Sequence, residues 1–234
     1  MKLFDTHIHT SESSRCSDIS AKELVRLYKE ANYDAIFITD HLYTRHSRKF
    51  YGYDGTQPWS YVIDKLLVGY HTALDEGKKL GLEVYLGVEL HLDDHNNDYL
   101  IYGIDEEFLY KHENLQRMTL PEVSKITHDN GLLLIQAHPF RPNITRDYLD
   151  FIDGVEVFNG HPNHASQNRK AYALALERNF MMTSGSDCHH LECKGISAVG
   201  TGGMLFYDDI KSTKEFVDAV KKLRYKLIFD PRIR

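Results

Sequence analysis

Two pairs of potential metal ligands share the same spacing near the two ends of the chain. His7 and His9 lie two residues apart at the end of the apolar segment 2–8, and Asp187 and His189 repeat this spacing. Residues two apart in an extended chain point to the same side. Because imidazole and carboxylate groups both bind divalent transition metals, each pair is suited to hold a cation.

Three further apolar segments also end in residues of this kind. The segments 35–39, 83–90 and 132–137 lead to His41, Glu89 and His138, respectively. Glu89 is the only such residue at the end of its segment, and a carboxylate can bridge two metal ions. Random scatter of the 14 histidines would not place ligand-type residues after five segments in turn, so we predict one metal centre.

Strand and helix patterns alternate along the whole sequence. Strands are predicted at 2–8, 35–39, 83–90, 99–104, 132–137, 154–158 and 181–184, with a last pair at 203–207 and 226–229. Helices are predicted at 20–32, 60–80, 120–129, 163–179 and 213–224, with Ser20 as the first N-cap. The strands are mostly continuously apolar, which favours an α/β fold with a parallel sheet. Without an obvious linker, seven such units predict a single barrel domain over 1–234. The carboxyl ends of its strands would meet at one face.

The segment 42–59 has no periodicity and is too long for a simple connection, so we predict a functional loop over the site. Its aromatic residues could stack on a nucleotide base or pack over the barrel mouth: Tyr43, Phe50, Tyr51, Tyr53 and Trp59.

Composition narrows the classes of partner. The net charge of −6 and the lack of a strongly basic stretch argue against a partner of duplex nucleic acid. The three cysteines, Cys16, Cys188 and Cys193, have no disulfide-framework spacing, and no apolar run is long enough to cross a membrane. A cytoplasmic protein without a membrane partner is expected.

The ordered motifs His7-Ile8-His9, Thr39-Asp40-His41, Gly87-Val88-Glu89, Ala137-His138-Pro139 and Ser186-Asp187-Cys188-His189 resemble those of the PHP family, named for polymerase and histidinol phosphatase domains. The resemblance covers nearly the whole chain. It implies a distorted (β/α)7, TIM-like barrel with two or three divalent ions (Zn, Mn or Fe). It also implies phosphoester hydrolysis of a small phosphorylated metabolite, a nucleoside bisphosphate or a short oligonucleotide.

The resemblance also implies roles for individual residues. One metal would be held by His7, His9, Glu89 and Asp187, a second by His41 and His189, and a third by Glu89 with His138. Glu89 and Asp187 are the expected catalytic carboxylates.

Two positions depart from the family pattern. Cys16, Asp18 or Glu12 could complete the second site, and a Cys16 thiolate would favour zinc. Asp98 could complete the third site, with His91 and His95 as alternatives, and a two-metal enzyme remains open.

We expect a hydroxide bridging two cations to attack phosphorus while the cations neutralise the phosphoryl oxygens. Arg141 lies three residues after His138 and could bind the phosphate through two hydrogen bonds. Asn159 and His161 follow the strand at 154–158 and could contact substrate.

Two other functions fit a metal cluster. An amidohydrolase-type C–N hydrolase would usually carry a carbamylated lysine on a middle strand, where this sequence has Glu89. A non-catalytic metal-binding protein would fill every coordination position with protein groups, whereas a catalytic metal keeps one open.

Overall fold

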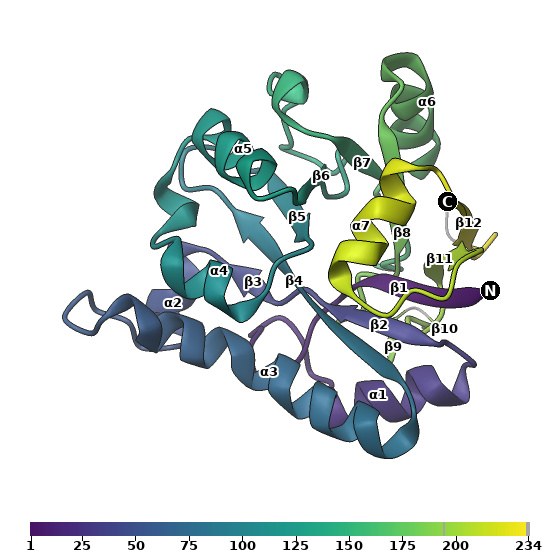
Figure 1. Ribbon diagram of the computed structural model, residues 1–234, viewed down its shortest axis with the longest axis horizontal. Coiled ribbons are helices and arrows are strands. Elements are labelled where there is room, and N and C mark those ends of the chain that lie inside the picture. The colour runs from purple at the N-terminus through teal and green to yellow at the C-terminus, as the bar shows by residue number, and fades with distance from the viewer. Residues whose placement is uncertain (194, 233–234) are drawn as a thin grey trace.

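A computed structural model describes residues 1–193 and 195–232 of the chain (Figure 1). Its main sheet has ten strands in the order β12-β11-β1-β2-β4-β5-β6-β7-β8, with β3 paired to β4. The fold is a mixed α/β barrel, which confirms the predicted distorted TIM-like architecture.

The strands of the main sheet are β1 (Lys2–Ile8), β2 (Ala35–Ile38), β3 (His41–Leu42), β4 (Glu83–His91), β5 (Asp98–Tyr102), β6 (Leu133–Gln136), β7 (Gly154–Asn159), β8 (Met181–Gly185), β11 (Gly202–Phe206) and β12 (Tyr225–Phe229). A separate small sheet pairs β9 (Glu192–Cys193) with β10 (Ile196–Ser197). All nine predicted strands are therefore present, with bounds shifted by at most two residues.

The helices are α1 (Ala21–Glu30), α2 (Thr44–Lys49), α3 (Trp59–Leu80), α4 (Glu106–Lys111), α5 (Leu120–Asp129), α6 (Asn168–Arg178) and α7 (Thr213–Lys221), with 3-10 turns η1 (Leu115–Arg117) and η2 (Leu149–Phe151). Ser20 caps α1 as predicted, because its side chain accepts a hydrogen bond from the backbone N–H of Glu23. The prediction for 163–179 began too early, since Gln167 has a left-handed backbone and precedes the first turn of α6.

The expectation of a wholly parallel sheet is wrong at β5. This strand runs antiparallel to both β4 and β6, whereas the pairs β1–β2, β2–β4, β6–β7 and β7–β8 are parallel. Only the residues 92–97 join β4 to β5, and so short a connection can only make a hairpin. Consequently β5 begins at the face where its two neighbours, β4 and β6, end. Asp98, the first residue of β5, lies at that face.

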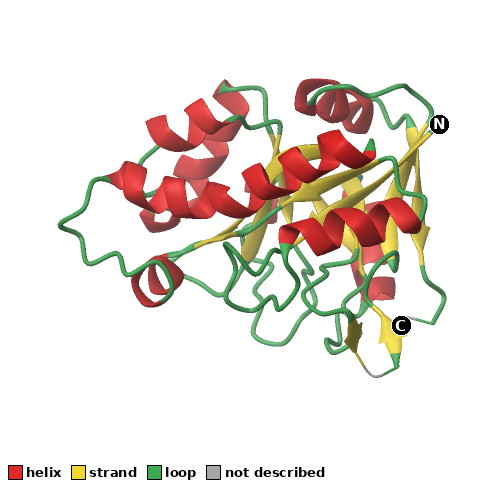
Figure 2. Ribbon diagram, turned by 90° about the horizontal axis from the view of Figure 1, so that it is seen from below, coloured by secondary structure: helices red, strands yellow, loops and turns green. Residues whose placement is uncertain are grey.

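The sheet curls until its two sides meet. Ile8 at the end of β1 forms a parallel bridge with Cys188, just beyond β8. The antiparallel pair β11–β12 continues from β1 and also contacts β8. Helices lie outside the barrel in Figure 2, where loops gather on one side of the strands.

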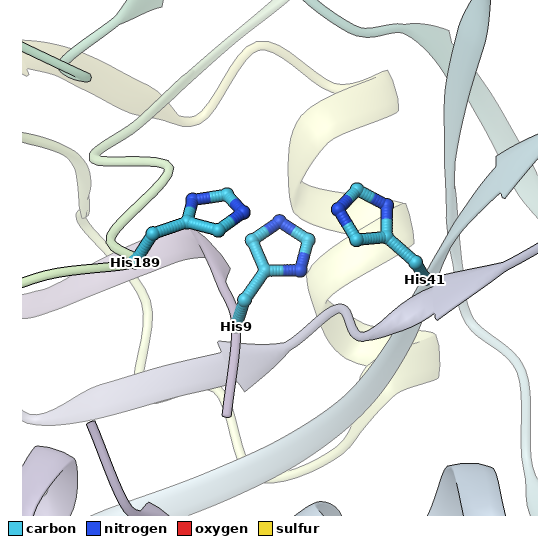
Figure 3. A group of neighbouring side chains, drawn as sticks. All are labelled: His9, His41 and His189. Atoms are coloured by element: carbon cyan, nitrogen blue, oxygen red, sulfur yellow. The ribbon is translucent and has the colours of Figure 1, made fainter. Parts of the chain in front are cut away.

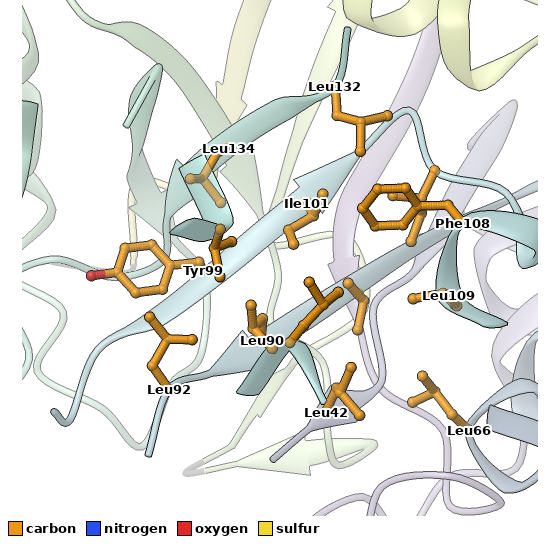
Figure 4. Packing of buried hydrophobic residues seen from close by; sticks show 14 of the residues in the cluster. Leu42, Leu66, Leu90, Leu92, Tyr99, Ile101, Phe108, Leu109, Leu132 and Leu134 are labelled. Carbon is orange, nitrogen blue, oxygen red and sulfur yellow. The ribbon is translucent and has the colours of Figure 1, made fainter. Parts of the chain in front are cut away.

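The barrel wall is apolar on both of its faces. Leu90, Tyr99 and Ile101 pack outward against residues such as Leu66 of α3 and Phe108 of α4 (Figure 4). A separate cluster contains Phe4, Phe37, Tyr85, Tyr102 and Phe206, on which α7 packs Phe216. Strands buried on both faces explain the continuous apolar segments of the sequence.

The segment predicted as a loop at 42–59 contains β3 and α2. Tyr51 and Trp59 are buried, and their side chains donate hydrogen bonds to the backbone oxygens of Ser13 and Leu109. These two rings therefore pack in the core, whereas Tyr43 is only half-buried and stays beside His41. Among the residues that the structure describes, no helix is both long and apolar enough to span a membrane.

Gly69 allows α3 to lie directly against the strand ends. A Cβ atom there would lie 2.0 Å from Thr10 Oγ1 and 2.7 Å from Asp40 Oδ2. Both residues adjoin predicted metal ligands, so this close approach positions the site from outside the barrel.

Gly69→Ala should therefore destabilise the fold, although Gly→Ala inside an ordinary helix stabilises it by about 1 kcal/mol. We expect the free energy of unfolding in urea to fall by about 1–3 kcal/mol because of overpacking. Val68→Ala, at an exposed neighbour on the same helix, is the control and should change it by less than about 1 kcal/mol. A stabilised Gly69→Ala protein would contradict the close packing.

Candidate metal centre

Glu89 lies at the centre of a buried cluster of imidazoles. One carboxylate oxygen, Oε2, is 3.2 Å from His9 Nε2 and 2.9 Å from His41 Nδ1. The other oxygen, Oε1, is 3.0 Å from His138 Nε2 and 3.4 Å from His7 Nε2. Four predicted ligands from three different strand ends thus surround one carboxylate, since His7 and His9 both lie at the end of β1.

Asp187 divides its two oxygens between different neighbours. Oδ1 faces His7 Nε2 at 3.4 Å and His9 Nε2 at 3.3 Å. Oδ2 accepts hydrogen bonds from the Arg141 guanidinium and, at 3.1 Å, from Asn159 Nδ2. One oxygen is therefore free for a cation while Arg141 and Asn159 hold the other.

The remaining predicted ligands complete the cluster. His9 lies between His41 and His189, with its ring centroid 4.3 Å and 4.2 Å from theirs (Figure 3). Asp98 Oδ2 lies 3.7 Å from His138 Nε2, while its other oxygen accepts a 2.7 Å hydrogen bond from His91. His91 therefore contacts Asp98 and not the cluster, and His95 pairs with Asp94 and Tyr99.

Several buried atoms of the cluster lack a hydrogen-bond partner, as expected where a cation belongs. Among the described side chains these include Glu89 Oε2, Asp187 Oδ1 and His41 Nδ1. In addition, the Nε2 atoms of His7 and His9 are 3.1 Å apart. Three groups of side chains have ligand atoms close enough to share an ion: His9–His41–His189, His7–His9–Glu89, and Glu89–Asp98–His138. Imidazole and carboxylate donors fit Zn²⁺, Mn²⁺ or Fe²⁺.

The carboxylates remain ionised despite their burial. Burial would raise the pKa of Glu89, but His7 and His41 outweigh it and hold the pKa well below its usual value. Burial has the same effect on Asp187, where His7 and Arg141 lower the pKa well below normal. Both groups can therefore neutralise cations at neutral pH.

Sequence reasoning missed Glu156, the residue that orients His7. Its Oε1 accepts a 2.8 Å hydrogen bond from His7 Nδ1, which leaves Nε2 to face the cluster. Its Oε2 accepts hydrogen bonds from the backbone N–H of His138 and from Asn159 Nδ2, at 3.0 and 2.9 Å. The available signal was a carboxylate in the middle of an otherwise apolar strand, β7.

Asp40 supports the opposite side of the cluster and was also missed. It accepts hydrogen bonds from the backbone and hydroxyl of Thr10 and from Ser14, whose hydroxyl lies 3.5 Å from His9 Nδ1.

Two predicted ligands, His138 and Asp187, have backbone φ angles of 30° and 52°. Such left-handed conformations are strained in residues other than glycine and often occur at functional sites.

The cluster opens into a pocket of about 300 Å³. Predicted substrate residues Arg141 and His161 line it, together with Cys16. The pocket also includes His164 and His190, which the sequence analysis did not single out. Burial lowers the pKa of His161 to about 3, so its imidazole is neutral. Its Nδ1 accepts a hydrogen bond from the backbone N–H of Asn163, which leaves the Nε2–H as the donor.

The structure separates the three candidates for the second site. Cys16 lies against His41 and His189. In contrast, Asp18 pairs with His190, and Glu12 accepts hydrogen bonds from the backbone N–H of Ala21 at the start of α1. Enclosure in the pocket would raise the pKa of the Cys16 thiol, but His41 and His189 lower it to about 5.

Solved structures with the same fold are known. A two-domain protein from Bacteroides vulgatus, described as containing a predicted PHP-like metal-dependent phosphoesterase, superposes with a TM-score of 0.62 and 18% identity. That match covers 97% of this chain, which spans only 64% of the other protein. PsfC from Pseudomonas syringae gives a TM-score of 0.63 and 18% identity, covering 99% of this chain and 92% of PsfC. No curated protein sequence matches the chain.

One structural neighbour corrects the expectation about duplex nucleic acid. Endonuclease Q, solved with a 27-mer duplex whose abasic lesion is at the active site, superposes with a TM-score of 0.60 and 13% identity. The match covers 95% of this chain and 57% of the endonuclease. Excluding a duplex partner from the net charge and the lack of a strongly basic stretch was therefore wrong, since a protein that contains this fold binds one.

Family models complete the comparison. Residues 5–184 match the model described as PHP domain, and residues 165–225 match the one described as PHP-associated. The first match contains β1 to β7 and includes His7, His9, His41, Glu89 and His138. The chain belongs to the PHP-domain family.

Proposed function

We propose that this protein is a metal-dependent phosphoesterase that acts on a small phosphorylated substrate. One observation carries the proposal: Glu89 and Asp187 lie buried among four imidazoles, with carboxylate oxygens that have no hydrogen-bond partner. Family membership supports the same reaction. Among the described residues that line the pocket there is no lysine, which disfavours the amidohydrolase alternative.

Two or three divalent cations would be held by residues of the three groups defined above, together with Asp187. His7, His9, Glu89 and Asp187 would serve the first ion, His41 and His189 the second, and Glu89, His138 and Asp98 the third. When bound, such cations lower the pKa of water and neutralise charge on phosphoryl oxygens.

The chain's own residues would position the substrate from one side of the pocket. Arg141 holds Asp187 and Asn159, and its Nε has no partner among the described residues. A guanidinium can keep one such contact and still donate to a phosphoryl oxygen. The neutral His161 supplies an N–H donor nearby without adding positive charge. Asn159 contacts Asp187, Glu156 and Arg141, so it would act by positioning them.

Cys16 supports an assignment of zinc to the second ion. A thiolate together with the imidazoles of His41 and His189 forms a sulfur–nitrogen donor set, which is typical of zinc. Asp18 and Glu12 have partners elsewhere, which leaves Cys16 as the candidate on this side of the pocket.

The reaction is tested with metal-loaded protein and a panel of substrates. We expect phosphate or nucleotide release from at least one of histidinol phosphate, a nucleoside bisphosphate, a short oligonucleotide and a duplex with an abasic site. Asp187→Asn keeps the shape but removes a buried charge, and it should lower kcat about 100-fold or more, as when a charge-stabilising group is lost. Full turnover by this variant at full metal content would exclude the assigned role.

Glu156→Gln tests the orientation of His7. Both carboxylate oxygens of Glu156 accept hydrogen bonds, but a glutamine amide has only one oxygen and an NH2 group in place of the other. That NH2 group would face either His7 or the N–H groups of His138 and Asn159. We expect metal affinity, measured by competition with a chelator, to fall about 10–100-fold. Glu83→Gln, on a half-buried side chain at the start of β4, is the control. Equal affinities in both variants would refute the orienting role.

Cys16→Ser tests the thiolate. Cobalt(II) bound to the wild-type protein should show a sulfur-to-cobalt charge-transfer band in the near ultraviolet, and Cys16→Ser should lose it. Cys188→Ala serves as the control, because Cys188 is a second cysteine near the pocket among the described side chains, and it should keep the band. A band that persists in Cys16→Ser would show that the sulfur is not a ligand.

A further inference from the structure

Three basic side chains beside the catalytic pocket have no acidic partner. Arg15, Arg45 and Lys49 line one hollow of about 150 Å³, together with Tyr43 and Phe50. None of the three makes an ion pair within the described part of the chain, although lysines and arginines elsewhere, such as Lys2 and Arg224, do. Like charges gathered without an acidic neighbour repel one another, and an anion bound between them would relieve this cost.

The three cations are held together by buried hydrogen bonds. Arg45 and Lys49 lie four residues apart on α2, so they share one face of the helix. His46 and Tyr51 are buried and both donate to the backbone oxygen of Ser13, at 2.8 and 2.7 Å. These bonds fix α2 against the segment that carries Arg15. Burial lowers the pKa of His46 to about 4, so His46 adds no charge.

A continuous series of hollows joins this cluster to the catalytic pocket. A hollow of about 470 Å³ shares His41 and Asp98 with the catalytic pocket, and shares Tyr43 and Arg45 with the basic hollow. Tyr43 lies at the junction, with its ring centroid 5.8 Å from that of His41 and 5.5 Å from that of His91.

The middle hollow differs in charge from its basic neighbour. It contains Asp93, which accepts a 2.7 Å hydrogen bond from Thr44, and Asp98, which is bound by His91. Arg45 and His91 line the same hollow and offset these two carboxylates, so it offers no net positive charge to a phosphate and fits an uncharged polar group. A ligand that extends through all three hollows would have an anion at each end and a neutral middle.

We propose that Arg15, Arg45 and Lys49 bind a second phosphate of the substrate, separated from the scissile phosphoryl group by an uncharged part that lies against Tyr43. The inference rests on the proposed phosphoesterase activity and narrows its substrate class. The second phosphate belongs either to a small bisphosphorylated molecule or to the next unit of a nucleic-acid strand.

The double variant Arg45→Ala/Lys49→Ala tests the second phosphate site, and Arg48→Ala is the charge control. Arg48 is exposed on the same helix but does not line the basic hollow. Rates are measured with p-nitrophenyl phosphate, which has one phosphate, and with thymidine 3′,5′-bisphosphate and the tetranucleotide p(dT)4, which have more. The quantity compared is the ratio of kcat/KM for each longer substrate to that for p-nitrophenyl phosphate.

We expect the double variant to lower this ratio at least about tenfold for one or both longer substrates, whereas Arg48→Ala leaves it within about twofold of wild type. A decrease with thymidine bisphosphate identifies a small-molecule site, and a decrease with p(dT)4 alone identifies a strand site. Unchanged ratios, or equal decreases in both variants, overturn the inference.

Binding separates failure of this inference from failure of the proposed activity. Fluorescein-labelled p(dT)4 is titrated with each metal-loaded protein at several salt concentrations, and fluorescence anisotropy is recorded. If nothing on the panel is hydrolysed, the activity proposal fails, yet weaker binding and a shallower salt dependence in the double variant alone still support the basic site. Equal affinity in all three proteins, or no binding by wild type, overturns it. Thermal unfolding of each variant confirms that the fold is retained.

Discussion

The burial of two ionised carboxylates is the constraint on which the rest of this structure depends. Glu89 and Asp187 each expose about 1% of their surface, and an unpaired charge in such a place is strongly unfavourable. Four imidazoles from three strand ends surround Glu89, and Arg141 holds one oxygen of Asp187. Because Glu89 Oε2 and Asp187 Oδ1 still lack partners, this compensation is incomplete without added positive charge.

That constraint also explains features of the backbone around the predicted ligands. At Gly185 a Cβ would lie 2.5 Å from His7 Cβ, so only glycine lets β8 approach β1 closely enough. Gly69 allows a similar approach of α3 to Thr10 and Asp40. The antiparallel β5 brings the start of a strand, with Asp98, to the face where the other strands end. The two glycines let backbone segments pack close to the cluster of carboxylates and imidazoles, and the direction of β5 places Asp98 beside it.

The gathering of the predicted ligands could be foreseen from the sequence, because the ends of parallel strands lie at one face of the fold. His7, His9, His41, Glu89, His138, Asp187 and His189 all follow apolar segments, and parallel strands bring such ends together. The direction of β5 could not be predicted, since an apolar strand reads alike in both directions and only the short connection after His91 forces the hairpin. Glu156 was missed because an acidic residue within a strand does not reveal which face or neighbour it meets. Likewise, spacing alone left Cys16, Asp18 and Glu12 equivalent, and the partners of each side chain distinguish them.

Net charge misled the prediction about partners for a related physical reason. A net charge of −6 determines the electrostatic potential far from the protein. Recognition of a phosphate depends instead on a few cations within several ångströms, where screening by salt is weak. Of the cations that line the basic hollow, Arg45 and Lys49 lie on α2, within the segment 42–59 whose sequence showed no periodicity, and Arg15 lies on the segment after Ser13. The metal centre, in contrast, is built from the barrel strands. If the proposed second phosphate site is correct, reaction and substrate preference reside on different parts of the chain. Changes within α2 can alter which phosphorylated molecule is bound while the strand ends that carry Glu89 and Asp187 keep their geometry.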